Sequence, residues 1–443
     1  MLRKPRLYRG RPCQSLPVYS VSLGCPKNRV DTEHCLGSLG VRIVPTQNPS
    51  QARLILINTC AFIESAVKES LQTLFAVCTE IQDQPRKPLL VVCGCLPGRY
   101  GKQALEKDIP EVDLWLEPKE IEQWPLLIAK HLQLQKSPKP GRLRSTAPSY
   151  AWLKIADGCR HKCSFCTIPA IRGSYVSSPL DAILQEAKEL VADGVLELDL
   201  VAQDVTGWGK DCGKSLLDLL PKLAELPNLL WLRLLYCYPT GVNDALLALI
   251  KSVGQPLLPY FDIPLQHADP NILASMGRPF AKDPRILINH IHDRLPEAIL
   301  RTTVIVGYPG ETDEAFEKLY RFVEEGHFLH LGVFCYEAEE GTVAATLPNQ
   351  VPKEQARQRR EALMSLQQAI SREYLQRFLG ETQTILVDAV HPEWPGLYTG
   401  RSWFQAPEVD GVTYVSGKAK VGQACVGEIV DTMDYDLSAL VCE

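Results

Sequence analysis

Three short apolar runs in the first 150 residues each end in cysteine. VYSVSLGC ends at Cys25, LILINTC ends at Cys60, and LLVVCGC carries Cys93 and Cys95. Stretches with helical periodicity lie between these runs, and the alternation predicts a parallel α/β domain over residues 17–132. The carboxyl ends of parallel strands form the ligand crevice of such a sheet. We therefore expect thiols from the three strands to converge on one object as a three-thiolate site.

Two of these cysteines compete for one place in that site. Cys93 and Cys95 are two residues apart, so on a strand their side chains face the same way. The pattern by itself leaves open which thiol completes the set.

A longer series of βα units follows a linker. Residues 133–150, QLQKSPKPGRLRSTAPSY, are rich in Pro, Ser and Lys and lack apolar periodicity, which is typical of a linker. From residue 151 helix-like stretches alternate with six strand-like runs: AWLKIA, LELDLVA, LLWLRLLY, PYFDIPL, RTTVIVGY and HLGVFCY. Repeated units of this kind predict an open, partial (β/α)6 barrel over residues 151–378 rather than a closed barrel of eight units.

The pattern changes twice more before the C-terminus. Residues 353–380 predict a docking helix whose apolar face carries Leu363, Leu366, Ile370, Tyr374 and Phe378. Residues 379–443 have short β-branched runs broken by Gly and Pro, which predict a small antiparallel β-barrel. The predicted fold class is therefore a multidomain α/β chain that ends in a small β-barrel.

Composition and charge limit the class of protein and the compartment in which it is expected. The chain has 443 residues, a net charge of −5 and a pI near 6.1, which argues against a surface that attracts nucleic acid throughout. No run approaches the roughly 18 apolar residues of a membrane span, and the basic start lacks the apolar segment of an export signal. Fifteen cysteines in such a chain favour thiolate ligands and free thiols in a reducing cytoplasm. Those without ligand spacing are expected to be structural: Cys13, Cys35, Cys78, Cys212, Cys237, Cys335, Cys425 and Cys442.

The stretch DGCRHKCSFCTIP, residues 157–169, follows the first predicted barrel strand. Its Cys159, Cys163 and Cys166 have Cx3Cx2C spacing, and a closed zinc site would need a fourth ligand, for which the local candidate is His161. A cubane 4Fe–4S cluster suits three thiolates better, because it has four irons and one stays open. A sulfonium ligand at that iron could accept an electron, break a carbon–sulfur bond and release a carbon radical.

The longer stretch KIADGCRHKCSFCTIPAIRG resembles the radical SAM superfamily. The resemblance implies that Cys159, Cys163 and Cys166 hold a 4Fe–4S cluster whose free iron binds S-adenosylmethionine (SAM). It also implies that Gln203 and Asp204, in LVAQDV at the end of the second barrel strand, approach this cofactor.

A second strand end is implied to approach SAM in the same way. The stretch VIVGYPGET, at the end of the fifth barrel strand, carries Gly307, Pro309 and Glu311. The alternative is that this stretch is a Gly-Pro turn leading into a helix capped by Thr312.

The order of the predicted domains resembles the methylthiotransferases over nearly the whole chain: a cluster domain, a radical SAM barrel and a TRAM domain. The resemblance implies that Cys25 (SLGCPKNRVD), Cys60 (NTCAFIESA) and Cys95 (CGCLPGRY) hold a second 4Fe–4S cluster that carries or hands over sulfur. The family pattern of Gly-Cys followed by Leu selects Cys95. Cys93 is then a small buried hydrophobic residue.

One branch of these enzymes modifies tRNA adenosine, and another modifies an aspartate of a small-subunit ribosomal protein, protein twelve. Three stretches resemble the second branch: NTCAFIESAVKES, DIPLQHADPNILASMGRP and GRSWFQAPEVDG. Residues 381–443 carry ten Asp and Glu against three Lys and Arg, a net charge of −7 that leaves +2 for the rest of the chain. Such a module would repel a phosphate backbone and attract a basic ribosomal protein, although the same charge would also keep a barrel soluble.

The sequence thus predicts a methylthiotransferase that acts on the β-carbon of a ribosomal-protein aspartate. The alternatives are a tRNA methylthiotransferase and a non-catalytic iron–sulfur protein. Replacing an unactivated C–H bond needs a radical, because no side-chain base is strong enough. The family's route uses one SAM to methylate sulfur at the second cluster and another to abstract hydrogen from the substrate, so both clusters must face one cavity.

The same resemblance suggests partners and further residues. The substrate would be the ribosomal protein, possibly within an assembling ribosome, with an electron donor and a sulfur source; no membrane is expected and tRNA is the less favoured substrate. His267 and Arg278 would line the active cavity or form a satisfied polar pair. Trp403 and Phe404 would contact the protein partner or lie in the core of the small barrel.

Overall fold

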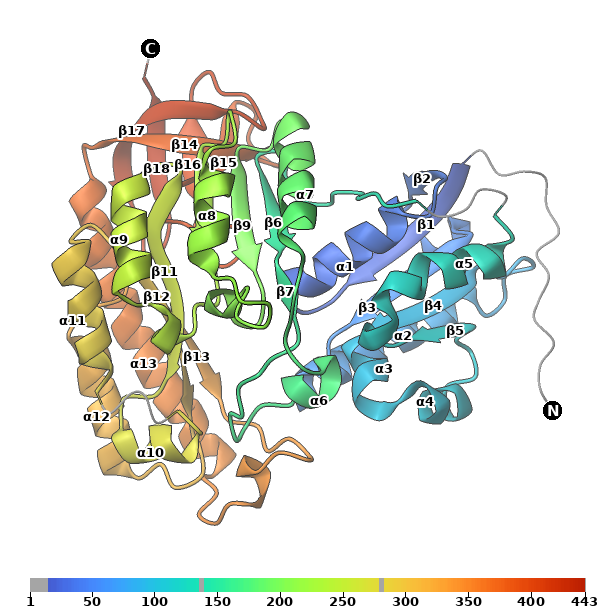
Figure 1. Ribbon diagram of the computed structural model, residues 1–443, viewed down its shortest axis with the longest axis horizontal. Coiled ribbons are helices and arrows are strands. Elements are labelled where there is room, and N and C mark those ends of the chain that lie inside the picture. Colours follow the sequence, from blue (N-terminus) through green and yellow to red (C-terminus); the bar gives the residue numbers. More distant parts are fainter. Residues whose placement is uncertain (1–14, 135–138, 279–282, 443) are drawn as a thin grey trace. The chain divides into compact units, whose positions relative to one another are not determined.

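A computed structural model describes residues 15–134, 139–278 and 283–442 (Figure 1). Contacts divide the chain into two compact units. The first holds the N-terminal part up to Ser145 together with residues 158–160 and 166–174, and the second holds residues 146–157, 161–165 and 175 onward. Cys159 and Cys166 are therefore counted with the first unit and Cys163 with the second. Cys13 and residues 135–138 of the predicted linker lie outside the described residues.

The first unit is built on a five-stranded sheet in the order β2-β1-β3-β4-β5, in which every pairing is parallel, as predicted. Separate hydrophobic clusters pack on its two faces, which is why β3 and β4 are buried throughout and read as continuous apolar runs. The elements are β1 (Ser15–Ser22), α1 (Pro26–Gly37), β2 (Arg42–Pro45), β3 (Leu54–Thr59), α2 (Glu64–Ile81), β4 (Leu89–Gly94), α3 (Cys95–Tyr100), α4 (Lys102–Asp108), β5 (Leu114–Leu116), α5 (Trp124–Leu132) and α6 (Ile168–Arg172).

The end of the predicted linker packs on α1 of the same unit. Glu33 is buried, and its carboxylate accepts hydrogen bonds from Arg142 Nε at 2.8 Å and from the backbone N–H of Ser145 at 2.7 Å. A buried carboxylate needs such partners, so the last residues before the second unit have a fixed place.

The second unit contains a six-stranded sheet in the order β13-β12-β11-β10-β9-β6, with all pairings parallel. This confirms the predicted partial (β/α)6 barrel, since each predicted strand is present. The strands are β6 (Tyr150–Lys154), β9 (Glu197–Val201), β10 (Trp231–Leu234), β11 (Leu257–Gln266), β12 (Ile299–Val306) and β13 (His330–Cys335), and a two-stranded ribbon joins β7 (Ala156–Asp157) to β8 (Val176–Ser177).

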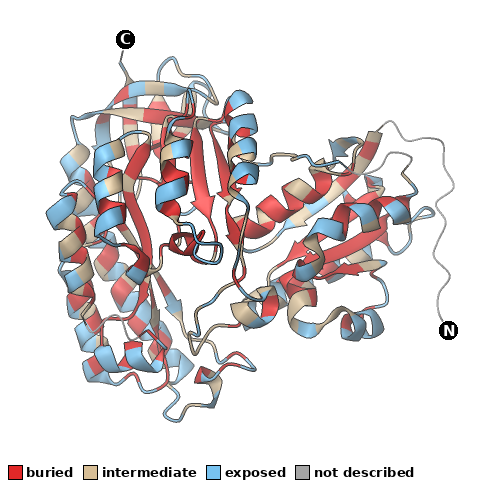
Figure 2. Ribbon diagram, in the orientation of Figure 1, coloured by how far each residue is buried: buried red, intermediate tan, exposed pale blue. Residues whose placement is uncertain are grey.

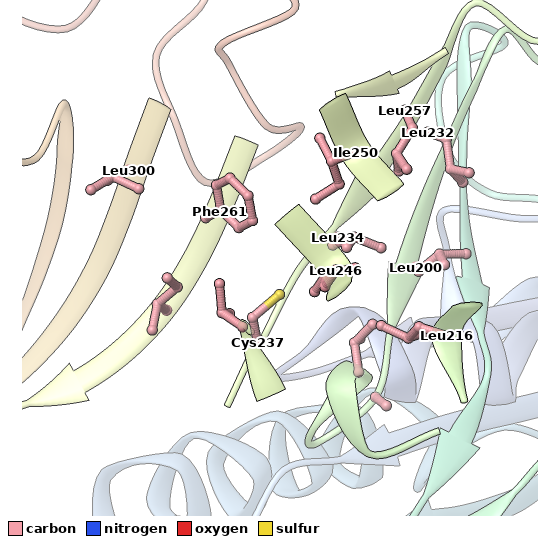
Figure 3. Close-up of a cluster of buried hydrophobic side chains, with 14 of the residues drawn as sticks. Leu200, Leu216, Leu232, Leu234, Cys237, Leu246, Ile250, Leu257, Phe261 and Leu300 are labelled. Carbon is pink, nitrogen blue, oxygen red and sulfur yellow. The ribbon is translucent and has the colours of Figure 1, made fainter. Parts of the chain in front are cut away.

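Helices flank this sheet, and the strands are its most buried part (Figures 1 and 2). Leucines on several strands of this sheet, such as Leu200, Leu232 and Leu300, form one cluster with side chains of the helices (Figure 3). The helices are α7 (Leu180–Ala192), α8 (Leu216–Ala224), α9 (Asp244–Val253), α10 (Pro270–Ser275), α11 (Pro284–Arg294), α12 (Asp313–Glu324) and α13 (Lys353–Leu375).

Helix α13 is the predicted docking helix, but its buried face is centred differently from the prediction. Leu363 is buried as expected, whereas Leu366 and Ile370 are only partly buried. The buried row also contains Gln367 and Ser371, because both side chains donate hydrogen bonds to Leu329 O beside β13. Polar residues on a buried helix face are invisible to apolar periodicity.

The C-terminal residues form a closed five-stranded barrel in the order β14-β15-β16-β18-β17. Four neighbouring pairs are antiparallel, but β16 and β18 pair in parallel, so the barrel is not uniformly antiparallel as predicted. A parallel pair closes the sheet between strands that do not follow one another in the chain. The strands are β14 (Thr382–Val390), β15 (Leu397–Ser402), β16 (Thr413–Ser416), β17 (Ala424–Thr432) and β18 (Leu437–Val441).

Polar side chains join this barrel to the amino-terminal ends of the sheet strands in the same unit. Arg401 Nη1 lies 2.5 Å from Glu197 Oε2, at the start of β9. Asp410 accepts hydrogen bonds from Tyr260 on β11 at 2.6 Å and from Arg301 on β12 at 2.6 Å. Carboxyl ends of parallel strands carry the chemistry of such folds, so the barrel occupies the opposite end.

The aromatic pair of GRSWFQAPEVDG lies at this junction. Phe404 is fully buried and stacks on Phe378 with the ring centres 4.0 Å apart, which confirms the core interpretation for this residue. Trp403 is partly buried, and its carbonyl accepts a hydrogen bond from Arg233 Nη1 at 2.7 Å.

Within the described ranges, no helix has both the length and the apolar character needed to span a bilayer.

Candidate functional site

The three strand-end thiols of the first unit come together. Cys25 follows β1 and precedes α1, Cys60 follows β3, and Cys95 begins α3. Cys25 Sγ and Cys95 Sγ each lie 3.9 Å from Asn28 Oδ1. Cys60 lies against Gly24, where an added Cβ would be only 2.8 Å from Cys60 Sγ. Parallel strands therefore deliver three thiols to one edge of the sheet, in the way the sequence predicts.

Cys93 and Cys95 face opposite sides, contrary to the expectation that they would point the same way. Strand β4 ends at Gly94, whose φ of +92° turns the chain into α3. A Cβ at Gly94 would lie 2.1 Å from Asn58 Oδ1, so the turn requires glycine. Cys93 is fully buried in the cluster that contains Cys35. Cys95 belongs to the cluster on the other face of the sheet.

A layer of buried polar side chains supports the three thiols. Asn28 Nδ2 donates to Leu23 O at 3.0 Å and to Thr59 O at 2.9 Å, which aims Oδ1 at the sulfurs. Asn58 Nδ2 donates to Asn28 O at 2.7 Å. Ser70 Oγ accepts from Cys60 N at 3.1 Å and donates to Cys60 O at 2.7 Å. The backbone segments that carry Cys25 and Cys60 are thus held by buried side chains.

Sequence reasoning did not single out Asn28 or the cation beside it. Arg172, on α6, donates one hydrogen bond to Asn28 Oδ1 and another to Asp31 Oδ2 at 2.9 Å. Asn28 and Asp31 are three and six residues after Cys25 in SLGCPKNRVD, a helix-start pattern that could have flagged them. No local signal links them to Arg172, which is more than 140 residues away in the chain.

Burial favours the protonated thiol at two of these cysteines in the chain without a cluster. Burial, together with the nearby Cys95 and Cys25 sulfurs, raises the pKa of Cys60 to about 11, although a backbone hydrogen bond from Phe62 partly opposes it. Burial also raises the pKa of Cys95, which Arg172 opposes through its charge and a hydrogen bond. Cationic iron would replace the protons, because a metal centre binds the thiolate form. All cysteines in the described part of the chain are free thiols, so none of these is taken up by a disulfide.

The Cx3Cx2C loop is held by main-chain contacts at several points. Gly158 has a φ of +70°, and a Cβ there would lie 2.1 Å from Ser174 O. In the first unit, Cys159 N donates to Gly173 O at 3.2 Å. In the second unit, Ser164 N donates to Met276 O at 3.1 Å. Cys159, Cys163 and Cys166 are all partly exposed free thiols, as ligands of a substrate-accessible centre must be.

His161, the candidate fourth ligand in this loop, is engaged elsewhere. Its Nε2 lies 2.8 Å from Asp204 Oδ2, and its ring stacks on Tyr238 with centres 3.5 Å apart and planes 7° apart. Asp204 is in turn oriented by Thr206 Oγ1, which donates to Asp204 Oδ1 at 2.6 Å. His161 is therefore already paired with side chains of the second unit.

The other predicted cofactor residues lie at two strand ends of the second unit. Gln203 follows β9, and its buried Oε1 has no hydrogen-bond partner. Gly307, Pro309 and Glu311 are buried after β12, where Glu311 Oε2 accepts from the backbone N–H groups of Gly307 and Tyr308. The stretch is thus a turn held by its own carboxylate.

The helix that follows this turn begins as the alternative interpretation predicted. Thr312 Oγ1 accepts from Ala315 N at 3.2 Å and caps α12. Glu311 Oε1 has no hydrogen-bond partner but forms an ion pair with Arg359 Nη1 at 3.5 Å, and His267 Nε2 lies 3.8 Å from it. One carboxylate oxygen of Glu311 therefore holds the turn, and the other faces a buried cation.

His267 and Arg278 are both buried and have separate partners. His267 Nδ1 accepts from Asp269 N at 2.9 Å, and Nε2 has no hydrogen-bond partner. Arg278 Nη1 donates to Pro264 O at 3.1 Å, and its guanidinium lies 4.8 Å from the centre of the Tyr238 ring. The Tyr238 ring therefore contacts both His161 and Arg278.

Within the described residues, no three His, Cys, Asp or Glu side chains are gathered closely enough to hold a single metal ion. The thiols of a cubane stand further apart than the ligands of one ion, because four irons and four sulfides lie between them.

Comparison with known proteins gives the chain's relatives. Residues 17–117 match the uncharacterized protein family UPF0004, residues 153–323 match the radical SAM superfamily, and residues 379–442 match the TRAM domain. A solved structure of the radical S-adenosylmethionine methyltransferase TsrM from Kitasatospora setae is similar with a TM-score of 0.53, covering 87% of this chain and 80% of that chain at 13% identity. At that identity the similarity concerns the fold alone.

Similarity to curated proteins extends over the full length. The ribosomal protein uS12 methylthiotransferase RimO of Nitratidesulfovibrio vulgaris (strain DP4) is 55% identical over 429 residues, which are 96% of this chain and 100% of the relative. RimO of Oleidesulfovibrio alaskensis is 52% identical over 96% of this chain and 100% of the relative, and RimO of Aquifex aeolicus is 43% identical over 94% and 95%. The chain therefore belongs to the RimO family of ribosomal protein uS12 methylthiotransferases, within the radical SAM superfamily.

Proposed function

We propose that this protein adds a methylthio group to the β-carbon of an aspartate in ribosomal protein uS12, and that it does so with SAM and two 4Fe–4S clusters. Cys159, Cys163 and Cys166 would hold the cluster that binds SAM, and Cys25, Cys60 and Cys95 would hold the second. The observation that carries the proposal is the convergence of Cys25, Cys60 and Cys95 beside Asn28, in a chain 55% identical to a RimO along its whole length.

Some residues around the proposed SAM-binding loop hold the loop in place, and others would contact the cofactor. When bound to a 4Fe–4S cluster, SAM supplies a carbon radical that can remove hydrogen from an unactivated carbon. His161 holds the loop through Asp204 and Tyr238, and so keeps itself away from the open coordination position. Gln203 Oε1 is a buried acceptor without a hydrogen-bond partner, and Glu311 Oε1 is paired with the Arg359 guanidinium at 3.5 Å without a hydrogen bond; hydroxyl and ammonium groups of a cofactor would supply the missing donors.

Asp204, Gly307 and Pro309 contribute to that proposed SAM site in a supporting way. Asp204 orients His161, and Gly307 has a φ of +75° at a point where a Cβ would lie 2.4 Å from Ala356 Cβ. Pro309 keeps the turn rigid ahead of Glu311. A fixed turn would hold the Glu311 carboxylate in place without a reorganisation when the cofactor binds.

The charge of the small barrel supports a protein substrate less simply than its net value of −7 indicates. Asp410 is paired with Arg301 of the sheet, so one negative charge of the barrel is offset at this junction, whereas Asp388 is paired with Arg401, whose charge the net value already includes. In the described part of the barrel, five acidic residues are exposed: Glu381, Glu393, Glu408, Glu428 and Asp431. These favour a basic ribosomal protein over RNA, and we place the reaction in the cytoplasm, on uS12 either free or in an assembling ribosome.

The test is an anaerobic reaction with separate substrates. Reconstituted protein is incubated with SAM, dithionite and sulfide, together with uS12, small ribosomal subunits or tRNA, and the products are analysed by mass spectrometry. A methylthio group on one uS12 aspartate is expected; modified tRNA adenosine with unmodified uS12 would refute the proposal, as would bound clusters without SAM cleavage.

A matched pair of variants tests the second cluster. Cys95→Ala should abolish methylthio transfer while 5'-deoxyadenosine still forms, because the SAM-binding loop is untouched. Cys93→Ala should retain transfer, because this thiol faces the opposite side of the sheet. If Cys93→Ala abolished methylthio transfer and Cys95→Ala retained it, Cys93 and not Cys95 would be the third ligand of the second cluster.

A further inference from the structure

The cation beside the second thiol site comes from the segment that follows Cys166. Arg172 is the last residue of α6, and its side chain is 1% exposed, as is that of its partner Asp31. Its guanidinium donates to Asp31 Oδ2 at 2.9 Å and to Asn28 Oδ1. All of these residues belong to the first unit. A buried arginine with two acceptors is a fixed charge, since a guanidinium does not lose its proton in a protein.

Asn28 links this charge to the thiols. Its Oδ1 accepts from Arg172 and lies 3.9 Å from the sulfurs of Cys25 and Cys95. The amide cannot turn away, because both protons of Nδ2 are used by Leu23 O and Thr59 O. The guanidinium, the amide oxygen and two of the three sulfurs thus form one contiguous buried group.

Helix α6 has little freedom to move Arg172 elsewhere. Thr167 Oγ1, at its start, donates to Phe62 O at 3.0 Å, two residues after Cys60. Ile171 is buried in the same hydrophobic cluster as Cys95. Gly98 on α3 leaves room for the helix, since a Cβ at Gly98 would lie 3.0 Å from Ile171 O. Packing on both sides therefore fixes the place from which Arg172 reaches the site.

We propose that Arg172 is a positioning and charge-compensating residue of the Cys25, Cys60 and Cys95 site. It orients Asn28 against the sulfurs and offsets the negative charge of a thiolate-bound cluster next to Asp31. The inference rests on the proposed function, because it assumes that a second cluster occupies this site. It adds that residues 166–174, which end the SAM-binding loop, also complete the second site, so one segment serves both.

The charges around the site predict the direction in which each variant shifts the reduction potential of the second cluster. Three thiolates and the Asp31 carboxylate are four negative groups in a buried site, and Arg172 is a cation hydrogen-bonded to Asp31 within it. A nearby positive charge stabilises the more negative, reduced form of a cluster, and a nearby negative charge destabilises it. Removing the charge of Arg172 should therefore lower the reduction potential of the second cluster, and removing the charge of Asp31 should raise it.

The experiment isolates this cluster in the full-length chain. In a Cys159→Ala, Cys163→Ala and Cys166→Ala background, only the second site can bind iron. Iron content is measured after anaerobic reconstitution, and the midpoint potential is followed by dithionite titration. Arg172→Gln should shift the potential downward and Asp31→Asn should shift it upward. Arg29→Gln is the matched control and should leave it unchanged, because Arg29 on the same helix as Asp31 donates to Ser145 Oγ at the surface.

Opposite shifts in midpoint potential for Arg172→Gln and Asp31→Asn distinguish an effect of charge from a loss of packing. Loosened packing would move both variants in one direction, so equal signs or no shift would overturn the inference; if Arg172→Gln does not fold, the sign of Asp31→Asn decides. Arg172→Lys keeps the charge and should restore most of the potential. In the full set of cysteines, Arg172→Gln should reduce methylthio transfer roughly 10- to 100-fold, the usual cost of losing a residue that orients metal ligands.

Failure of the proposed function would look different. If the triple-alanine background binds no iron, there is no second cluster, and the proposed function and this inference are both overturned. If it binds iron and the variants leave its potential unchanged, Arg172 has no role at the cluster, while the proposed function stands.

Discussion

Arg401→Met gives a direct measure of how the C-terminal barrel is held to the sheet. Arg401 is 3% exposed and Glu197 is fully buried. The guanidinium contacts Glu197 Oε2 at 2.5 Å and Asp388 Oδ2 at 2.7 Å, and Arg233 Nε completes the network at 2.9 Å from Glu197 Oε1. Methionine fills a similar volume without charge, so the variant leaves a buried carboxylate with one cation fewer.

The expected cost is large for one side chain. Removing one partner of a buried ion pair costs about 3–5 kcal/mol, because the remaining charge stays desolvated. An exposed ion pair on a helix contributes very little to stability, because water screens the two charges. Arg321 and Glu317 on α12 form such a pair, with side chains 63% and 56% exposed, so Arg321→Met is the matched control.

Urea unfolding of the reduced, iron-free chain measures both variants. The midpoint, followed by tryptophan fluorescence and far-ultraviolet circular dichroism, should fall clearly for Arg401→Met and hardly for Arg321→Met. Adding Glu197→Gln to Arg401→Met should restore part of the loss, since the two sites share one hydrogen bond and are not additive. A loss below about 1 kcal/mol for Arg401→Met would refute the view that this pair holds the junction.

Three further outcomes follow from the cysteine sites. Gly94→Ala should lower bound iron from about eight to about four atoms per chain, because its φ is +92° and the new Cβ would lie 2.1 Å from Asn58 Oδ1; unchanged iron content would contradict this. Gly158→Ala, with a Cβ 2.1 Å from Ser174 O, should instead abolish SAM cleavage, measured as 5'-deoxyadenosine. Burial raises the pKa of Cys35 from 9.0 to about 12, so the folded chain keeps a proton that the unfolded chain loses. The free energy of unfolding is therefore unaffected by this thiol below pH 9, and it falls as the pH rises from 9 toward 12 because only the unfolded chain ionises there. Cys35→Ala should flatten the fall in urea midpoint over that range, and an equally steep fall would contradict the assignment.

Local patterns determined much of the fold and the convergence of one set of cysteines. Each predicted strand of the first sheet, each of the six barrel strands and the closed C-terminal barrel is present, because period-two or continuous apolar runs bounded by Gly and Pro specify strands locally. The convergence of Cys25, Cys60 and Cys95 followed from the rule that parallel strands end at one edge.

Only the tertiary structure decided which neighbours complete the sites. The turn at Gly94 sends Cys93 and Cys95 to opposite faces, and it depends on Asn58 from another strand. Arg172 reaches Asn28 across 144 residues, and the buried row of α13 includes Gln367 because backbone carbonyls beside β13 accept its hydrogen bonds. Apolar periodicity reports burial against an unspecified partner, whereas a buried polar or charged group is stable only beside the particular group that the fold brings to it.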